Sequence, residues 1–404
     1  MNMKRITFLG DIMIEPPVLK AAKRSGGRYD FTDVFRYVRP ILEESDYVIG
    51  NFETPLAGKE AKYTQHHYAF NAPDEYADAV KAAGIKLVST ANNHTFDRGY
   101  EGMVRTMQVL EEKGIGYAGT CLPGRERPEA FYFELDGTKI AVVVYTYNTN
   151  YGGSGGKYLA EGQWKGTVNL LRPQTIGTYL PGVMHAKDWV DKLFRKMPSE
   201  RRGWIKKFLG MCHTYARSDD RVDVEAMEPY IQQMQSDLRK AREKADLVLF
   251  FPHIGGQFNL KPGYFSRYVI HKAKEACPDA IIASHSHCPQ LARFEDGIPV
   301  VNSLGNFNMS PLSSLAYHEN LSEYGMLLHL YVQEQKIQKV TWTPILNYEK
   351  RGTTVSAYPV YDYYQTLKKE KDKVKLEADM KKLYGIVTGR VLTGEVFRKE
   401  YDLL

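Results

Sequence analysis

The chain has 404 residues, of which 43% are hydrophobic and 25% are charged, and its formal net charge is +6. This is ordinary globular composition, and it argues against an intrinsically disordered or fibrous protein. No apolar run approaches the ~20 residues of a membrane span, and there is no zinc-finger spacing, RNP-like run or long basic tail. We therefore expect a globular protein with a mildly cationic surface, no membrane segment and no nucleic-acid partner.

The N-terminus and the cysteines favour a reducing compartment. Met1–Met3 leads directly into an apolar strand-like run, without the h-region and cleavage pattern of a secretory signal. The four cysteines lie far apart and include no CxxC pair: Cys121, Cys212, Cys277 and Cys288. Free thiols in the cytoplasm are the simplest interpretation.

The first part of the chain, residues 1–147, alternates strands and helices. The apolar pattern predicts strands over 4–10, 46–50, 85–90 and 139–146, and helices over 31–44, 74–83 and 99–113. Gly114 follows a basic last turn and predicts a helix C-cap. Such alternation is typical of a parallel or mixed sheet covered by helices, and we expect strand 139–146 to extend the same sheet.

Residues 148–223 interrupt this alternation. A glycine-rich hinge over 151–157 opens a stretch rich in Trp, Arg, Lys and Gly, which predicts an inserted subdomain or lid with helices over 186–196 and 200–214.

The α/β pattern resumes over 224–360 and completes the domain. We expect helices over 224–244 and 267–276, strands over 247–251, 280–283 and 299–302, and antiparallel strands within 324–344. Residues 361–404 are heavily charged and predict a helical C-terminal tail.

Five of the predicted strands run directly into residues that bind metals. These residues are Asp11, then Asn51 and Glu53, then Asn92, Asn93 and His94, then His253, and finally His285 and His287. In an open α/β sheet, ligands bind just beyond the carboxyl ends of the strands. Carboxylate, amide and imidazole together form the ligand set of a metal centre. Six of the nine are candidate ligands, which exceeds the needs of one tetrahedral zinc and suits two metals that share a bridging carboxylate. These six are Asp11, Glu53, Asn93, His253, His285 and His287.

Each of these residues, taken alone, also has a purely structural interpretation. Asp11 suits a turn or a helix cap, and Asn93-His94 suits a hydrogen-bonded turn before an N-cap at Asp97. The pair His285 and His287 is stronger, because alternate residues of a strand project from one face. The joint pattern favours the metal site.

Six blocks in a fixed order carry a resemblance to a known family. They are Gly10-Asp11, Gly50–Pro55, Ala91–Gly99, Pro252–Gly255, Ser284–His287 and Ser303–Phe307. Together they resemble the poly-γ-glutamate capsule-synthesis (CapA-like) family, a variant of the calcineurin-like metallophosphoesterase superfamily. The resemblance covers roughly residues 5–145 and 225–310. It implies an α/β fold, the four-layer α/β/β/α sandwich with mixed sheets and an inserted subdomain.

The resemblance also implies roles for the site residues. Asp11 and His287 would hold a first divalent metal. Asn93, His253 and His285 would hold a second, and Glu53 would bridge the two. Manganese, iron and zinc all suit these ligands.

The same resemblance implies a catalytic pair and a set of substrate contacts. His94 would face the substrate and protonate a leaving oxygen, with Asp97 to orient it. Asn51, Asn92 and Asn306 would contact the substrate.

Two departures from the family pattern bear on function. Metallophosphoesterases begin with Asp-x-His, whereas Ile12 and Met13 follow Asp11 here. The first metal therefore lacks one imidazole ligand. The number of bound metals, one or two, is left open. The capsule-synthesis family shares this absence. Its membrane-anchored members carry an N-terminal anchor, and we expect none here, which argues against direct polymerisation at a membrane.

Three functions are compatible with these residues. The first is a metal-dependent hydrolase that cleaves a phosphoester in a small-molecule or polyanionic substrate, by a metal-activated hydroxide at a dinuclear site. The second is a γ-glutamyl amide hydrolase or poly-γ-glutamate assembly factor. The third is a non-catalytic binding protein with a degenerate metal site. The sequence leaves the oligomeric state open.

Overall fold

The computed structural model describes residues 3–65, 69–150, 166–174, 219–220, 222–313, 316–350 and 354–403. Most of the predicted insertion lies outside these residues, including its hinge and both of its expected helices, and so does Cys212. Cys121, Cys277 and Cys288 are free thiols. Within the described ranges, no helix combines the length and apolar character needed to cross a membrane.

The first of two sheets holds eight strands. Seven follow the order β13-β12-β11-β1-β2-β3-β4, and β14 pairs with β12. The parallel part consists of β1 (Lys4–Ile12), β2 (Tyr47–Phe52), β3 (Leu87–Ser89) and β4 (Gly116–Ala118). The antiparallel part consists of β11 (Tyr324–Gln333), β12 (Lys336–Lys350), β13 (Thr354–Pro359) and β14 (Tyr401–Asp402). The antiparallel strands predicted within 324–344 are therefore confirmed.

The second sheet holds six strands in the order β5-β6-β7-β8-β10-β9. They are β5 (Phe131–Leu135), β6 (Thr138–Thr146), β7 (Leu247–His253), β8 (Ala280–Ile282), β10 (Ile298–Val301) and β9 (Ala292–Glu295). β6, β7, β8 and β10 are parallel, and each edge strand is antiparallel to its neighbour. The expectation that strand 139–146 extends the first sheet is wrong. Its residues form β6, which pairs with β5 in a hairpin and with β7, because an apolar pattern predicts a strand but not its neighbours.

A hydrophobic core fills the space between the two sheets. It takes Phe8 and Ile49 from the first sheet and Leu249 and Phe251 from the second. The rings of Phe8 and Phe251 meet edge to face, with centroids 5.3 Å apart. Alternate residues of the same strands point to the outer faces, since side chains alternate along a strand.

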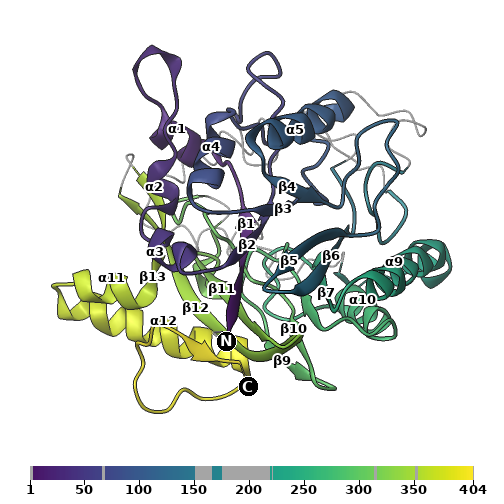
Figure 1. Ribbon diagram of the computed structural model, residues 1–404. Coiled ribbons are helices and arrows are strands. Elements are labelled where there is room, and N and C mark those ends of the chain that lie inside the picture. Colours follow the sequence, from purple (N-terminus) through teal and green to yellow (C-terminus); the bar gives the residue numbers. More distant parts are fainter. Residues whose placement is uncertain are drawn as a thin grey trace.

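Helices cover both outer faces (Figure 1). On the first sheet these are α1 (Pro16–Ala22), α2 (Thr32–Phe35), α3 (Arg39–Glu43), α4 (Glu75–Ala82) and α5 (Gly99–Lys113). On the second they are α9 (Val224–Lys244) and α10 (Tyr264–Lys274). The order of layers is helix, sheet, sheet, helix, so the predicted α/β sandwich is confirmed.

Two details of the helices test the local sequence signals. α5 ends at the predicted C-cap, where Gly114 adopts a left-handed φ of 68°. The single helix expected over 31–44 is instead two short helices, α2 and α3. Pro40 stands in the first turn of α3, where its missing N–H is harmless, whereas inside one continuous helix it would remove a hydrogen bond and clash with the preceding turn.

The C-terminal residues predicted to be helical form two helices that pack on the sheets, but the helices end at Thr388, and residues 389–403 are irregular apart from β14. α11 (Val360–Thr366) and α12 (Glu370–Thr388) follow β13. α12 buries Leu376, Met380 and Leu383 in the inter-sheet hydrophobic cluster, which also contains Trp342 of β12. The charged residues of α12 lie on the other side of the helix. The highly charged composition of the segment therefore does not reveal that one face of the helix is apolar.

This packing predicts the effect of truncating a side chain on α12. Leu383 is fully buried, so Leu383→Ala should lower the free energy of unfolding by about 2–5 kcal/mol. Val374 lies on the same helix with 58% of its surface exposed. Val374→Ala should change the free energy of unfolding by less than about 0.5 kcal/mol. Urea unfolding of both variants measures the difference. Equal small effects would show that α12 is not part of the folded core.

Candidate metal centre

The carboxyl ends of the parallel strands in the two sheets meet at one place. Asp11 lies near the end of β1, Glu53 follows β2, and Asn93 follows β3. From the second sheet, His253 ends β7, and two further histidines, His285 and His287, follow β8. All six predicted metal ligands are buried, and none is more than 6% exposed. The packing of one sheet on the other therefore brings together residues that are far apart in the chain.

One half of this cluster is built around His253. Its Nε2 lies 2.7 Å from Asn93 Oδ1 and 3.0 Å from His285 Nδ1. The same Nε2 is 3.6 Å from Glu53 Oε1. An amide oxygen, two imidazoles and a carboxylate thus converge on one point, and we call this set the histidine half-site.

The other half is built around Asp11 and is more acidic. Asp11 Oδ2 lies 3.2 Å from His287 Nδ1, which is in turn 2.9 Å from Asn306 Oδ1. Ligand atoms of Asp11, Glu53 and His287 all lie within 4.8 Å of one another. We call this set the aspartate half-site. Asn306 is fully buried beside it, and its Nδ2 donates to two backbone carbonyl oxygens.

Glu53 belongs to both halves. It lies within 4.8 Å of ligand atoms of His253 and His285 in one group, and of Asp11 and His287 in the other. Its Oε1 is buried and accepts no hydrogen bond from any described residue. Burial and the neighbouring Asp11 carboxylate raise the pKa of Glu53 well above its usual value. A buried carboxylate oxygen that accepts no hydrogen bond can instead bind a cation. A cation there would keep the carboxylates of Glu53 and Asp11 in their charged form.

The protonation states of the histidines also favour a bound cation. Burial lowers the pKa of His253 and of His285 well below the usual value for imidazole. Both rings are therefore neutral near pH 7 and keep a lone pair for coordination, as metal binding requires. The donor set suits a divalent transition metal.

Two buried asparagines hold the carboxylate ligands through hydrogen bonds. Asn51 Nδ2 donates to Asp11 Oδ1 at 2.8 Å and to Glu53 Oε2 at 3.3 Å. Asn92 Nδ2 donates to Asn51 Oδ1 and to the carbonyl oxygen of Phe52. Both asparagines are at most 1% exposed. The substrate contact expected of them stays a prediction, whereas their hydrogen bonds orient the carboxylates.

His94 and Asp97 form a second buried pair beside the histidine half-site. Asp97 Oδ2 is 2.5 Å from His94 Nδ1, and His94 Nε2 points toward Glu53 Oε1 at 3.8 Å. The ring of Phe70 stacks on His94 with centroids 4.2 Å apart, and the backbone N–H of Phe70 donates to Asp97. These contacts fix the imidazole so that its Nε2 faces the cluster.

The backbone that presents His285 and His287 differs from expectation. β8 ends at Ile282, and the two histidines lie in the following loop with φ angles of 103° and 55°. The proposed reason for their shared direction, alternation along a strand, is therefore wrong. Positive φ is costly for residues with a Cβ and is found mainly where the surrounding structure imposes it.

Gly10 explains the first sequence block. A Cβ on Gly10 would lie 1.9 Å from the carbonyl oxygen of Gly305. The backbone N–H of Asp11 donates to that oxygen at 3.2 Å, and the N–H of Phe307 donates to the carbonyl oxygen of Asp11. Glycine at this position lets the end of β1 approach the loop that carries Asn306.

Three residues near the cluster have no signal in the sequence pattern. Asn150 Nδ2 donates to Asp97 Oδ1 at 3.1 Å and its backbone N–H to the carbonyl of Asn93, so it ties the loop after β6 to the loop after β3. The ring of Tyr147 lies 4.5 Å from that of His285, and the guanidinium of Arg172 lies over Tyr147. All three lie in irregular segments, where neither period nor motif marks them.

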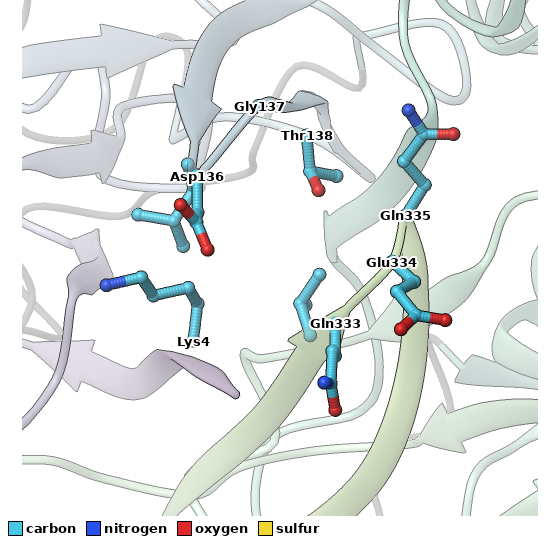
Figure 2. Close-up of a pocket in the computed structure, with 9 residues that line it drawn as sticks. Lys4, Asp136, Gly137, Thr138, Gln333, Glu334 and Gln335 are labelled. Atoms are coloured by element: carbon cyan, nitrogen blue, oxygen red, sulfur yellow. The ribbon is translucent and has the colours of Figure 1, made fainter. Parts of the chain in front are cut away.

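A separate pocket of about 290 Å³ lies at the opposite ends of the sheets (Figure 2). Lys4, Asp136 and Gln333 line it, at the start of β1 and at the β5–β6 and β11–β12 turns. Lys4 and Asp11 are separated by most of a strand, or roughly 20 Å at ~3.3 Å per residue. This pocket is therefore no part of the metal cluster.

Comparisons with known proteins identify relatives of the chain. Residues 5–310 match the family model for the bacterial capsule synthesis protein PGA_cap. The PGA biosynthesis protein CapA of Bacillus subtilis (strain 168) is 25% identical over 307 residues, which are 74% of this chain and 62% of that protein. The capsule biosynthesis protein CapA of Bacillus anthracis is 33% identical over 144 residues, which are 35% of this chain and 34% of that protein. The matched stretches thus span less than two thirds of either relative.

A hypothetical protein from Thermus thermophilus is similar to the structure at 15% sequence identity with a TM-score of 0.39, over 88% of this chain and 97% of that one. A similarity this low carries no conclusion. The family model, by contrast, spans about three quarters of the chain and includes every strand end of the cluster. On this match, the chain belongs to the bacterial capsule synthesis (PGA_cap, CapA-like) family.

Proposed function

We propose that this chain is a metal-dependent hydrolase that cleaves a phosphoester at the cluster centred on Glu53. The observation that carries the proposal is the buried Oε1 of Glu53, which has no hydrogen-bond partner in the described residues and faces ligands from both half-sites. A carboxylate in this position is suited to bridge two cations. Manganese, iron or zinc would fit, and one metal or two would occupy the site.

The proposed roles follow from the ligand sets. Asp11 and His287 would hold a metal in the aspartate half-site, with Asn306 close enough to contribute an amide oxygen. Asn93, His253 and His285 would hold a metal in the histidine half-site. Bound there, divalent metals activate water as a nucleophile and stabilise negative charge on phosphoryl oxygens.

The chain's own proton donor would be His94. Its Nδ1 is held by Asp97, so Nε2 is the atom free to give a proton to the leaving oxygen. Asp97 stabilises the protonated ring and keeps it oriented, and Asn150 holds Asp97. Asn51 keeps the carboxylates of Asp11 and Glu53 in place through its two hydrogen bonds.

A second candidate is cleavage or assembly at γ-glutamyl amide bonds. The name of the Bacillus subtilis relative, a PGA biosynthesis protein, favours it, and two-metal sites also serve aminopeptidases. Phosphoester and γ-glutamyl model substrates assayed side by side separate the two. The cytoplasmic location expected from the sequence stays a prediction.

Removing the charge of Glu53 tests the bridge. Glu53→Gln keeps the shape of the side chain but loses the carboxylate, so metal affinity should fall by more than about tenfold and turnover should fall with it. Metal analysis of protein purified without chelators measures the content. Glu101→Gln, at the start of α5 and exposed, is the matched control and should change neither. Full metal content in Glu53→Gln would contradict the proposed bridge.

Removing one histidine from each half-site tests whether two metals bind. If both half-sites are filled, His287→Ala and His253→Ala should each lose about one metal per chain, because each removes a ligand from a different set. Metal titration of the apo protein, followed by calorimetry, counts the sites. A single site that only His253→Ala removes would show that the aspartate half-site is empty, in line with the missing Asp-x-His imidazole.

Replacing His94 tests the proton donor. His94→Ala should lower kcat on a phosphoester with a poor leaving group by roughly 10²–10⁴-fold while metal content stays unchanged. The defect should shrink on a substrate whose leaving group needs no proton, such as an activated aryl phosphoester. The exposed His271→Ala is the control. An equal loss on both substrates would argue against the proton-transfer role.

A further inference from the structure

Residues 166–174 bring a cation to the edge of the metal cluster. The segment lies along the end of β6, where the backbone N–H of Thr146 donates to the carbonyl of Asn169 and that of Leu171 donates to the carbonyl of Thr146, both at 2.9 Å. Gln174 and Thr149 exchange hydrogen bonds of 3.0 and 2.7 Å. The chain on both sides of Arg172 is therefore anchored, on one side to the end of β6 and on the other, through the side chain of Gln174, to the loop that follows.

Two aromatic rings fix the side chain of Arg172. Its guanidinium carbon lies 4.9 Å from the ring centroid of Tyr147 and 5.0 Å from that of Phe265. The ring of Tyr147 in turn lies 4.5 Å from that of His285. Stacking on rings uses the faces of a guanidinium and leaves its in-plane N–H groups for an acceptor. The cation is thus held one ring away from a predicted metal ligand.

The side chain of Arg172 is half-buried, and its buried Nε makes no hydrogen bond in the described part of the chain. Asp219 is the carboxylate that acts on it, but the oxygens of Asp219 already accept hydrogen bonds from Gly263 and from the N–H and hydroxyl of Ser266. Burial lowers the pKa of Arg172 despite the attraction of Asp219. A buried donor of a cation that has no acceptor among the described residues fits an anion that arrives with the substrate.

Tyr147 connects the guanidinium of Arg172 with the cluster, because its ring centroid lies 4.5 Å from that of His285 and 4.9 Å from the guanidinium carbon. A ligand at the histidine half-site can therefore extend to this guanidinium.

We propose that Arg172 binds a phosphoryl oxygen of the substrate beside the metal cluster, and this rests on the proposed phosphoesterase function. A phosphoryl group carries its charge on several oxygens, so one can face the metals while another pairs with a guanidinium. The carbonyl of a γ-glutamyl amide is neutral, and the nearest charge in such a substrate is the α-carboxylate beside it. A phosphoryl group instead carries its charge at the reacting centre, and the comparison of phosphate with glutarate below separates the two anions.

Binding of inorganic phosphate, measured by calorimetry on the metal-loaded full chain, tests this. Arg172→Gln should weaken phosphate binding by roughly tenfold or more, because hydrogen bonds between charged groups are the strong ones. Arg172→Lys keeps the charge but loses the planar fork, and should show a smaller loss. Metal content should be the same in all of these proteins. Arg267→Gln removes an exposed cation from α10 nearby and should bind phosphate as the wild type does.

The outcomes separate this inference from the function on which it rests. Equal phosphate affinity in the wild type and Arg172→Gln would overturn the role of Arg172, even if phosphoesters are cleaved. Tighter binding of glutarate than of phosphate would also overturn it, in favour of a carboxylate site. Weakened phosphate binding in Arg172→Gln supports the inference, and if no phosphoester is then cleaved, the hydrolase proposal alone fails. If Arg172→Gln does not fold, the comparison moves to Arg172→Lys. Equal phosphate affinity in Arg172→Lys and the wild type would then argue against binding of phosphate by the planar guanidinium.

Discussion

The arrangement of this protein's candidate site depends on one buried carboxylate, that of Glu53. It lies where two sheets meet, beside a second carboxylate and three imidazoles, with one oxygen that no described residue satisfies. Two carboxylates in a dry site repel each other and resist ionisation, which is why the pKa of Glu53 is raised. Asn51 relieves part of this by donating to both carboxylates. A cation would relieve the rest, and ligand atoms of four other residues lie within 4.8 Å of Glu53: Asp11, His253, His285 and His287.

The division of ligands between the sheets ties the site to the fold. The first sheet supplies the oxygen ligands of Asp11, Glu53 and Asn93, and the second supplies the imidazoles. Neither sheet alone holds a complete set, so the site exists only when the inter-sheet core is packed. Asn150 crosses the same boundary to reach Asp97. Membership of the capsule synthesis family rests on the match to the family model, and the reaction itself is the proposal.

Much of this could be predicted from the sequence because strand ends in parallel sheets share an edge. The strand before Asp11, the helix capped by Gly114 and the alternation of elements follow from local patterns, and the structure contains each of them. The helix broken at Pro40 and the assignment of strand 139–146 to the wrong sheet show the limits of such patterns. A period of two predicts a strand, but pairing depends on contacts between distant residues.

The sequence by itself determined which chemical groups are available and that they follow strands, since residue type and periodicity are local properties. Only the tertiary structure decided that Glu53 faces both half-sites, that His285 and His287 reach the cluster through positive φ angles, and that Arg172 lies one ring away. Each of these depends on how segments far apart in the chain pack together. The physical reason is that burial, hydrogen-bond partners and electrostatic neighbours exist only once the two sheets are in contact.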